Sequence, residues 1–217
     1  MTLLPDQIRR RASVARLSTR NAASLVMLLV CLLASAQLSA DDAASCRIYW
    51  EATTRITWDN FEASATSSTA GSGISTGIEW NCGYALRQAP GRSAYTLSIP
   101  AETIVSVAWM NPEKSWMNPS QVTANSLEYL RLQFDIQHAY AQRLAIALQA
   151  AEAQVADPST VFNVIRQFAQ PILDAARQAS SQCGQQTLLG SNTAALSKWM
   201  ADVRYWIDTP QLVPLSW

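Results

Sequence analysis

The chain contains very few of the residues that usually bind metal ions, phosphate groups or nucleic acids. Histidine occurs once in 217 residues, at His138, and lysine occurs twice, at Lys114 and Lys198. No glycine-rich phosphate loop, nucleophile elbow or paired-carboxylate pattern is present in the sequence. These absences argue against nucleotide binding, and two lysines cannot form a polybasic membrane-binding patch.

The N-terminal segment differs from the rest of the chain in charge and hydropathy. Residues 1–20 contain five arginines against a single acidic residue, and an uncharged apolar run follows at 22–33. Small residues at 34–36 close the run. This order is typical of a secretory signal peptide. We therefore expect the protein to be exported, with cleavage after Ala36 or after Ala40.

A transmembrane anchor is the weaker interpretation of the same segment. Crossing a bilayer takes roughly 18 to 20 apolar residues, and the run is shorter than that. We therefore expect residues 1–40 to be a signal peptide and residues 41–217 to form a single domain, which is not membrane-embedded once the signal is removed. The expected location is the periplasm or the extracellular space.

Loss of residues 1–40 changes the charge balance of the chain. The remainder has eleven basic and fifteen acidic residues, which is a net charge of −4. Nucleic-acid binding needs a basic surface that neutralises phosphates. We therefore expect no nucleic-acid partner.

Three cysteines follow the predicted signal peptide, at Cys46, Cys82 and Cys183. In an oxidising compartment this odd number allows one disulfide and one remaining thiol. Cys46 and Cys82 each alternate with apolar residues, so on strands both would point to the apolar face. A disulfide between Cys46 and Cys82 is therefore the first expectation, and one between Cys82 and Cys183 is the alternative.

The first half of the remaining chain has the periodicity of β-strands. Residues 46–58 and 73–82 are predicted to be strands, and alternation at 95–99 and 105–109 predicts two more. The connections are short, which favours antiparallel pairing. The Ser/Thr/Ala/Gly-rich stretch at 63–73 has the composition of a mobile loop.

The second half has helical periodicity. Apolar residues recur every three or four positions from Ser120, which predicts a long helix ending near Ala153. A second helix follows Asp157, contains Pro171 and is expected to bend there and to end at Gly184.

Ser191 can cap a third helix, and the tail from Thr209 is expected to be extended. Strands followed by helices predict an α+β domain with a small antiparallel sheet of about four strands followed by three helices.

Several short motifs occur in an order that resembles a known protein family. They are Trp58-Asp59-Asn60-Phe61, Gly73-Ile74, Lys114-Ser115-Trp116, Phe134-Asp135-Ile136, Thr187-x-x-Gly190 and Trp199. Over residues 48–207 the chain resembles the bacterial family of predicted secreted zinc-dependent proteases, which is itself largely catalogued as a domain of unknown function. The resemblance implies a frame like that of a zinc peptidase.

The positions that would bind zinc in that family are replaced in this chain. The family carries His-Glu-x-x-His directly before Phe-Asp-Ile, because two imidazoles four residues apart bind the metal and the glutamate takes a proton from its water. Tyr129, Leu130 and Gln133 stand at those positions here, and Leu189 stands where the resemblance suggests another histidine. We therefore expect no catalytic residue, no metal and no cofactor at this degenerate site.

Polar residues around the same helix leave two interpretations open. Tyr129, Gln133 and Gln137 share one helix face, where they could line a vestigial cleft that binds a peptide or glycan, or merely satisfy buried polar neighbours. His138 could join Asp135 in this cleft or in a rebuilt polar site, although a solvated position on the helix surface is the simpler interpretation.

The sequence thus predicts an exported, non-catalytic relative of secreted zinc-dependent proteases that binds a peptide or an envelope protein. One alternative is an active metal-dependent peptidase with a site relocated to Asp135, His138 and the 63–73 stretch. The other is a structural component of the cell envelope.

Overall fold

Small β-sheets make up the first half of the structure. The computed structural model describes residues 46–64, 71–91 and 93–217. The strands are β1 (Ile48–Tyr49), β2 (Ala63–Ser64), β3 (Ser72–Gly73), β4 (Thr76–Asn81), β5 (Ala85–Gln88), β6 (Tyr95–Ser98), β7 (Val105–Met110), β8 (Trp116–Met117) and β9 (Glu152–Val155). They form three-stranded sheets in the orders β1-β7-β4, β2-β8-β3 and β5-β6-β9, and all pairs are antiparallel except the parallel pair β2 and β8.

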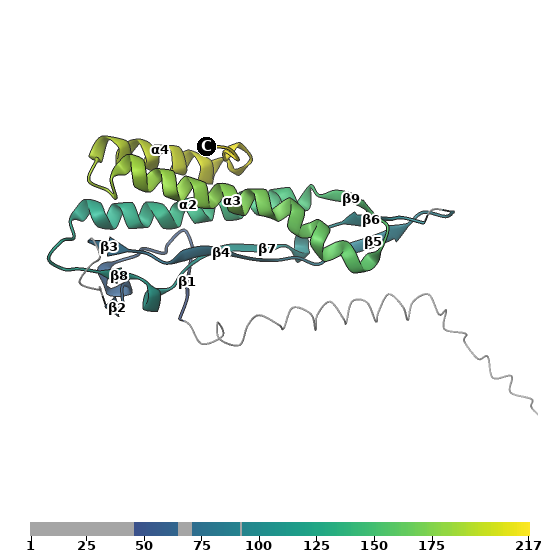
Figure 1. Ribbon diagram of the computed structural model, residues 1–217, viewed down its shortest axis with the longest axis horizontal. Helices are drawn as coiled ribbons and strands as arrows, with labels where there is room; N and C mark the ends of the chain where they lie inside the picture. Colours follow the sequence, from purple (N-terminus) through teal and green to yellow (C-terminus); the bar gives the residue numbers. More distant parts are fainter. Residues whose placement is uncertain (1–45, 65–70, 92) are drawn as a thin grey trace, which may run out of the picture. The chain divides into compact units, whose positions relative to one another are not determined.

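Long helices make up the second half. They are α2 (Ala124–Gln149), α3 (Val161–Thr187) and α4 (Thr193–Asp208), and short 3-10 turns lie at η1 (Trp58–Asn60), η2 (Ala101–Thr103), η3 (Pro112–Lys114), η4 (Pro158–Thr160) and η5 (Pro210–Leu212). Figure 1 shows α2 between the strands on one side and α3 and α4 on the other. The predicted α+β class is therefore confirmed.

α2 is the central helix because apolar side chains occupy more than one of its faces. Its N-terminus is capped by Thr123, whose hydroxyl accepts a hydrogen bond from the Ser126 N–H at 3.2 Å. Leu130, Leu144 and Leu148 along the helix are buried, and α2 contacts β4, β7, α3 and α4. The hydrophobic core therefore surrounds this helix.

Several predicted boundaries of strands and helices are wrong. The expected strand at 46–58 is reduced to β1, because the chain turns where the Thr54 N–H donates to the Glu51 carbonyl at 2.9 Å. The long helix ends at Gln149 rather than near Ala153, because the following residues form β9 and pair with β6. The strands predicted at 95–99 and 105–109 lie in different sheets.

Gly184 lies inside α3 and does not end the helix as predicted. A Cβ atom at this position would lie 3.0 Å from the Tyr129 hydroxyl, so the glycine makes room for the tyrosine. The helix continues to Thr187 and ends at Leu188, which has a left-handed backbone. Pro171 lies within α3, and Figure 1 shows the helix bending in its first half, as a proline without an N–H group leads one to expect.

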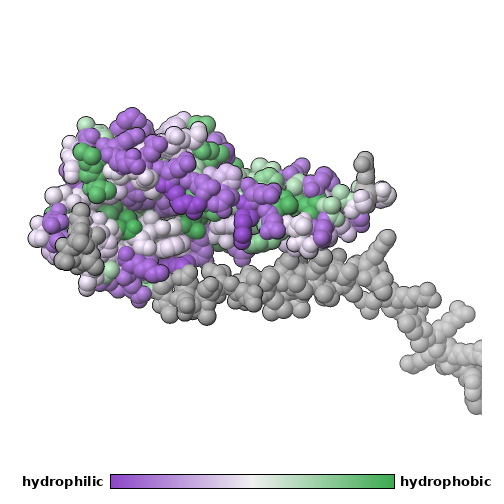
Figure 2. All heavy atoms as spheres, in the orientation of Figure 1, coloured by the Kyte–Doolittle hydropathy of each residue, from purple (hydrophilic) through white to green (hydrophobic). Residues whose placement is uncertain are grey.

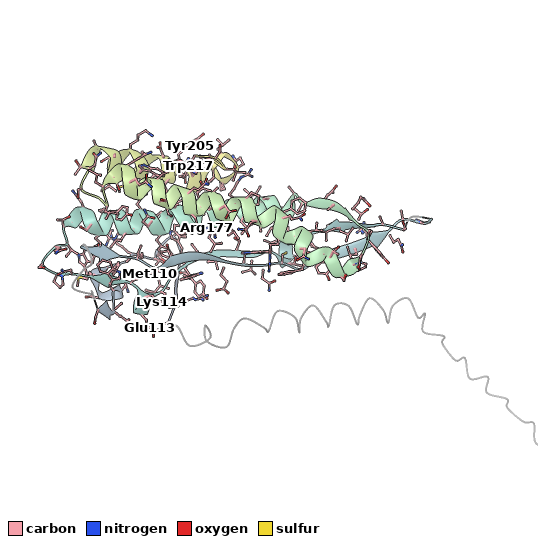
Figure 3. The ribbon with its side chains drawn as sticks, viewed as in Figure 1. Met110, Glu113, Lys114, Arg177, Tyr205 and Trp217 are labelled. Carbon is pink, nitrogen blue, oxygen red and sulfur yellow. The ribbon has the colours of Figure 1, made fainter. Side chains whose placement is uncertain are left out.

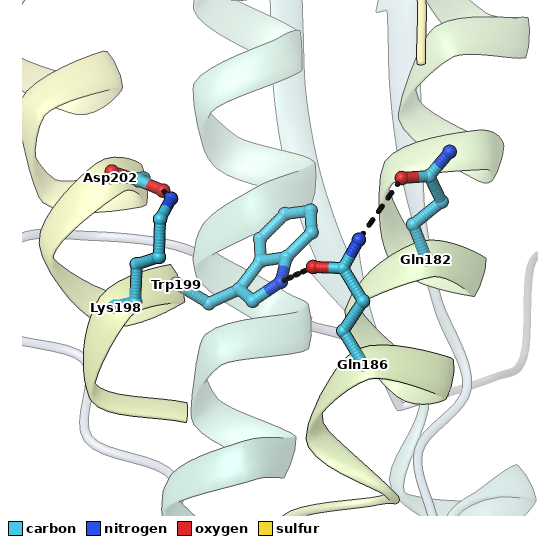
Figure 4. Close-up of polar contacts among 5 residues, drawn as sticks. All are labelled: Gln182, Gln186, Lys198, Trp199 and Asp202. Carbon is cyan, nitrogen blue, oxygen red and sulfur yellow. Dashed lines mark hydrogen bonds and ion pairs between the residues drawn. The ribbon is translucent and has the colours of Figure 1, made fainter. Parts of the chain in front are cut away.

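α4 packs on α3 through a polar contact at its centre. Its N-cap is Asn192, not the predicted Ser191, and the Asn192 side chain accepts a hydrogen bond from the Ala195 N–H at 3.2 Å. The Trp199 Nε1–H donates to Gln186 Oε1 at 2.9 Å, and Figure 4 shows this bond joining the two helices.

The tail after α4 folds back onto the helices instead of remaining extended throughout. Residues 210–212 form η5, and Val213 is buried. Trp217 stacks on Trp199 with ring centroids 5.1 Å apart, and its Nε1–H donates to the Tyr140 hydroxyl at 2.9 Å. Figure 3 shows Trp217 beside α4.

The predicted disulfide between Cys46 and Cys82 is wrong, and so is its alternative with Cys183, because all three thiols are free. β1 and β4 flank β7 on opposite edges, and Cys46 precedes the end of β1 that lies beside Met110, whereas Cys82 follows the end of β4 that lies beside Val105. At about 3.3 Å per residue along β7, this separation is far beyond the reach of a disulfide.

Two sequence predictions concern residues outside the described part of the chain. The predicted signal peptide and its cleavage after Ala36 or Ala40 fall within residues 1–45, and the centre of the 63–73 stretch falls within residues 65–70. The described residues lie within one compact unit, Ala40–Trp217. None of the described helices combines the length and the apolar character needed to cross a bilayer.

Candidate functional site

A cleft of about 700 Å³ lies where β4, α2 and α3 meet. Residues 72–78, which include β3 and the start of β4, contribute part of its lining. Side chains of β7, α2 and α3 and the turn after α3 contribute the rest of the described lining. The cleft therefore combines the edge of a sheet with two helices.

The positions that the sequence predicted to be degenerate come together in this cleft. Tyr129, Leu130 and Gln133 reach it from α2, and Leu189 reaches it from the turn after α3. Gln137 lies one helical turn beyond Gln133 and also lines the cleft. Residues that are far apart in the sequence thus share one site.

The two glutamines on α2 bind the same residue of α3. Gln133 Nε2 donates to the Ser180 carbonyl at 3.3 Å, and Gln137 Nε2 donates to the Ser180 hydroxyl at 2.9 Å. Both glutamines are buried. The Nε2 groups of both glutamines therefore satisfy the polar groups of Ser180, as one of the two open interpretations expected. The same side chains also line the cleft.

Tyr129 is held between two glycines. The hydroxyl lies beside Gly184, and a Cβ atom at Gly190 would lie 3.0 Å from the Tyr129 Cβ atom. Burial raises the pKa of Tyr129 to about 12, the nearby Cys183 adds to the rise, and a hydrogen bond with the Gln133 side chain opposes it. The phenol therefore stays protonated and acts in the cleft as a neutral hydrogen-bonding group.

The register of β4 shows which of its backbone groups are directed away from β7. The Asn111 N–H donates to the Ser75 carbonyl at 2.9 Å, so this carbonyl points toward β7, while the Ser75 N–H donates to Ser115 Oγ at 3.0 Å. Residues that face the partner strand alternate along an antiparallel ladder, so Gly77 bonds β7, whereas Thr76 and Ile78 direct their N–H and C=O groups away from it. Within the described residues β4 is an edge strand, and no hydrogen bond to the backbone of Thr76 or Ile78 is present.

Trp109 is a cleft residue that the sequence did not single out. Its ring lies across Gly77, where a Cβ atom would be 2.7 Å from the indole Cζ2 atom, and this contact brings the indole to the edge of β4. The glycine at 77 offered the only sequence signal, since a glycine within a strand often marks a close approach.

Arg177 on α3 is the only charged residue among the described residues that line the cleft. It forms an ion pair with Asp174, and Figure 3 labels it on α3. The remaining polar lining consists of hydroxyl and amide groups. A ligand of this site therefore meets mostly uncharged groups.

Asp135 and His138 do not line this cleft. The Trp50 Nε1–H donates to Asp135 Oδ1 at 2.8 Å, and the Trp50 ring stacks on His138 with centroids 3.4 Å apart. His138 is half-buried, so the expectation of a solvated surface position is wrong, and burial lowers its pKa to about 4. Burial raises the pKa of Asp135, and the hydrogen bond from Trp50 opposes this rise.

Asp135 instead lines a second groove of about 1050 Å³, to which Trp50, Arg131 and Arg204 also contribute. Three residues of the sequence prediction, Gln133, Gln137 and Tyr129, therefore lie together, while Asp135 and His138 lie elsewhere on α2.

The side chains of the cleft do not fit a zinc ion. Catalytic zinc normally takes three ligands from His, Cys, Asp or Glu, and Tyr129, Gln133 and Leu189 supply none of these. The Gln133 amide is also engaged as a donor to Ser180. In the part of the chain that the structure describes, no group of three or more His, Cys, Asp or Glu side chains is placed to hold a metal ion.

Comparisons with protein-family models, curated proteins and solved structures gave no match to this chain. The resemblance to secreted zinc-dependent proteases therefore stays a prediction from the sequence motifs.

Proposed function

We propose that this protein binds an extended peptide segment in the cleft beside β4 and does not cleave it. The observation that carries the proposal is the free backbone edge at Thr76 and Ile78, which belongs to residues lining the cleft. An extended peptide can add to such an edge as a further strand, with main-chain hydrogen bonds supplying the affinity. A glycan offers no matching series of N–H and C=O groups.

The chemistry of the cleft supports binding over hydrolysis. Tyr129 is neutral because of its raised pKa, and Gln133 and Gln137 are amides without acid or base character. Peptide hydrolysis needs an activated water or nucleophile and a group that transfers protons. None of these three side chains supplies either function.

The alternative of a relocated peptidase site receives no support from the described residues. Trp50 contacts both Asp135 and His138, and it lies apart from the β4 edge where a peptide would pair. The stacking indole covers one face of the His138 imidazole. A site built on these residues would not include the edge of β4 at Thr76 and Ile78, where the proposed peptide pairs.

The proposal includes export of the protein and its descent from a zinc peptidase. The charge and hydropathy of residues 1–40 support removal of a signal peptide and a location in the periplasm or outside the cell. Convergence of Tyr129, Gln133 and Leu189 in one cleft supports descent from a zinc-peptidase frame whose ligand positions were replaced. The peptide would then belong to an exported or envelope protein.

A binding selection with a matched pair of variants tests this function. Residues 41–217 are used to select from phage-displayed random decapeptides, and the best peptide is measured by calorimetry. Thr76→Pro removes the outward N–H but no ladder bond, so it is expected to weaken binding at least about tenfold. Thr76→Val keeps the N–H group and a side chain of similar shape, so binding is expected to stay within about twofold.

Two results would contradict the proposal. Equal peptide affinity of Thr76→Pro and the unchanged protein, with both folded by circular dichroism, would exclude pairing with the β4 edge. Cleavage products of the selected peptide in mass spectra, absent for the Gln133→Ala variant, would exclude a non-catalytic role.

A further inference from the structure

The turn after α3 exposes two leucines on a rigid backbone. Leu188 and Leu189 have φ angles of 50° and 55°, and their side chains are 64% and 55% exposed. Left-handed backbone positions are usually taken by glycine or asparagine, because a Cβ atom raises their energy. Two consecutive leucines therefore occupy positions that neither backbone preference nor burial explains.

The turn cannot easily rearrange to bury these side chains. The Leu189 N–H donates to the Gly184 carbonyl at 3.0 Å, and the Asn192 N–H donates to the Thr187 carbonyl at 2.8 Å. Thr187 is fully buried, and Gly190 packs against α2, since its Cβ atom would lie 2.9 Å from the Asn125 carbonyl oxygen. The leucines are therefore presented outward by an anchored turn, and Figure 2 shows a hydrophobic patch over the connection between α3 and α4.

The leucines border a second hollow that continues the cleft. This hollow measures about 550 Å³ and lies between Tyr129 and the last turns of α3. Tyr129, Ser180 and Leu189 line both the hollow and the cleft. None of the residues that line the hollow in the described part of the chain is charged. We name the surface formed by Leu188, Leu189 and the Tyr129 ring the leucine shelf.

We infer that the leucine shelf receives one large apolar side chain of the bound peptide. This inference rests on the peptide-binding function proposed above. A strand paired with Thr76 and Ile78 directs alternate side chains to opposite faces, so one set faces α2 and α3. The hollow continues the cleft on that side, and its uncharged lining suits an apolar group and penalises a charged one.

A peptide side chain is the occupant that fits the shelf best, because the hollow and the cleft adjoin each other. A separate apolar ligand would leave the adjoining strand edge unused, whereas a peptide occupies the edge with its backbone and the shelf with one side chain. The shelf therefore determines which peptide is bound, and the edge of β4 determines that a peptide is bound. One position of the ligand should be restricted to large apolar residues while its neighbours along the strand vary.

The test compares the selected peptide with an analogue in which its most restricted apolar residue is replaced by alanine. Against the unchanged protein, the alanine analogue is expected to bind at least about tenfold more weakly, because a buried apolar side chain is lost. Against the Leu188→Asn/Leu189→Asn variant, the difference between the two peptides is expected to fall to about twofold or less. Asparagine tolerates the left-handed backbone, so this variant keeps the shape of the turn.

The results test the leucine shelf and pairing with the edge of β4 separately. A selection that yields no apolar restriction, or a variant that retains the tenfold difference between peptides, overturns the leucine shelf. Loss of binding in Thr76→Pro together with an unchanged apolar preference in the leucine variant leaves the peptide-binding function intact and removes only the shelf. A leucine variant that loses its preference while Thr76→Pro binds normally keeps the shelf and overturns strand pairing.

Discussion

The rings of Trp50 and His138 lie parallel, with centroids 3.4 Å apart and an angle of 8° between their planes. Trp50 follows β1, and the same indole donates a hydrogen bond to Asp135 on α2. Trp50 thus ties the edge of the β1-β7-β4 sheet to the central helix. The neutral imidazole is part of this contact, because burial lowers the pKa of His138 to about 4.

This contact predicts a loss of stability in acid. His138 has a pKa of about 4 in the folded protein and an ordinary value of 6.5 when unfolded, so the unfolded state binds the proton more readily. Its stabilising contribution is complete above about pH 6.5 and is lost as the pH falls towards 4. The free energy of unfolding should fall by about 2 kcal/mol over this range, after allowance for partial exposure. Urea titrations followed by tryptophan fluorescence would measure it.

The control for this prediction is His138→Phe, which keeps a stacking ring and removes the titration. Its unfolding free energy should change much less between pH 6.5 and pH 4. The raised pKa of Asp135 acts in the opposite direction, because the folded state takes up that proton more readily. The comparison should therefore be repeated with Asp135→Asn, and an unchanged slope in His138→Phe would assign the acid sensitivity to other groups.

The sequence predicted the long amphipathic helices well because their periodicity reflects burial. Leu130 and Leu144 recur on the apolar stripe and are buried as expected. Helix ends were predicted less accurately, since Gly184 has the residue type of a helix end but packs against Tyr129. A glycine can end a helix or make room for a neighbouring side chain, and only the packing of α2 against α3 shows that Gly184 does the second.

The candidate site was predicted in part for a related reason. Tyr129, Gln133 and Gln137 share a face by helical spacing alone, so their common position in the cleft follows from local structure. His138 was misplaced because its partner Trp50 lies 88 residues earlier, and no local pattern encodes that pairing. The disulfide prediction was wrong because β1 and β4 lie on opposite sides of β7, an order that local sequence does not encode and that separates Cys46 from Cys82.

The contact between Gly77 and Trp109 predicts that Gly77→Ala changes the free energy of unfolding in opposite directions with and without the tryptophan. A Cβ atom at residue 77 would lie 2.7 Å from the indole, so Gly77→Ala should displace the ring and lower the free energy of unfolding by about 1 to 3 kcal/mol. In a Trp109→Val background this obstacle is absent. There Gly77→Ala should raise stability by about 0.5 kcal/mol, because alanine restricts the unfolded chain.

Chemical denaturation of the four proteins in this cycle measures the coupling directly. Similar losses of stability in both backgrounds would show that contacts other than Trp109 restrict residue 77. The result also bears on the cleft, since the same indole reaches the edge of β4.

The convergence of Tyr129, Gln133 and Leu189 predicts that a metal site can be built in the cleft by three substitutions. The variant Tyr129→His/Gln133→His/Leu189→His leaves the buried Leu130 unchanged and supplies two imidazoles one helical turn apart plus a third from the turn after α3. It should bind Zn²⁺ at least about tenfold more tightly than the variant with only the two α2 histidines, because the third ligand completes the protein's share of a tetrahedral site. Calorimetry would measure the affinity, and the visible spectrum of bound Co²⁺ would report the geometry. Equal affinities of the two variants would mean that Leu189 cannot direct a ligand toward α2, and the argument for descent from a zinc-peptidase frame would then fail.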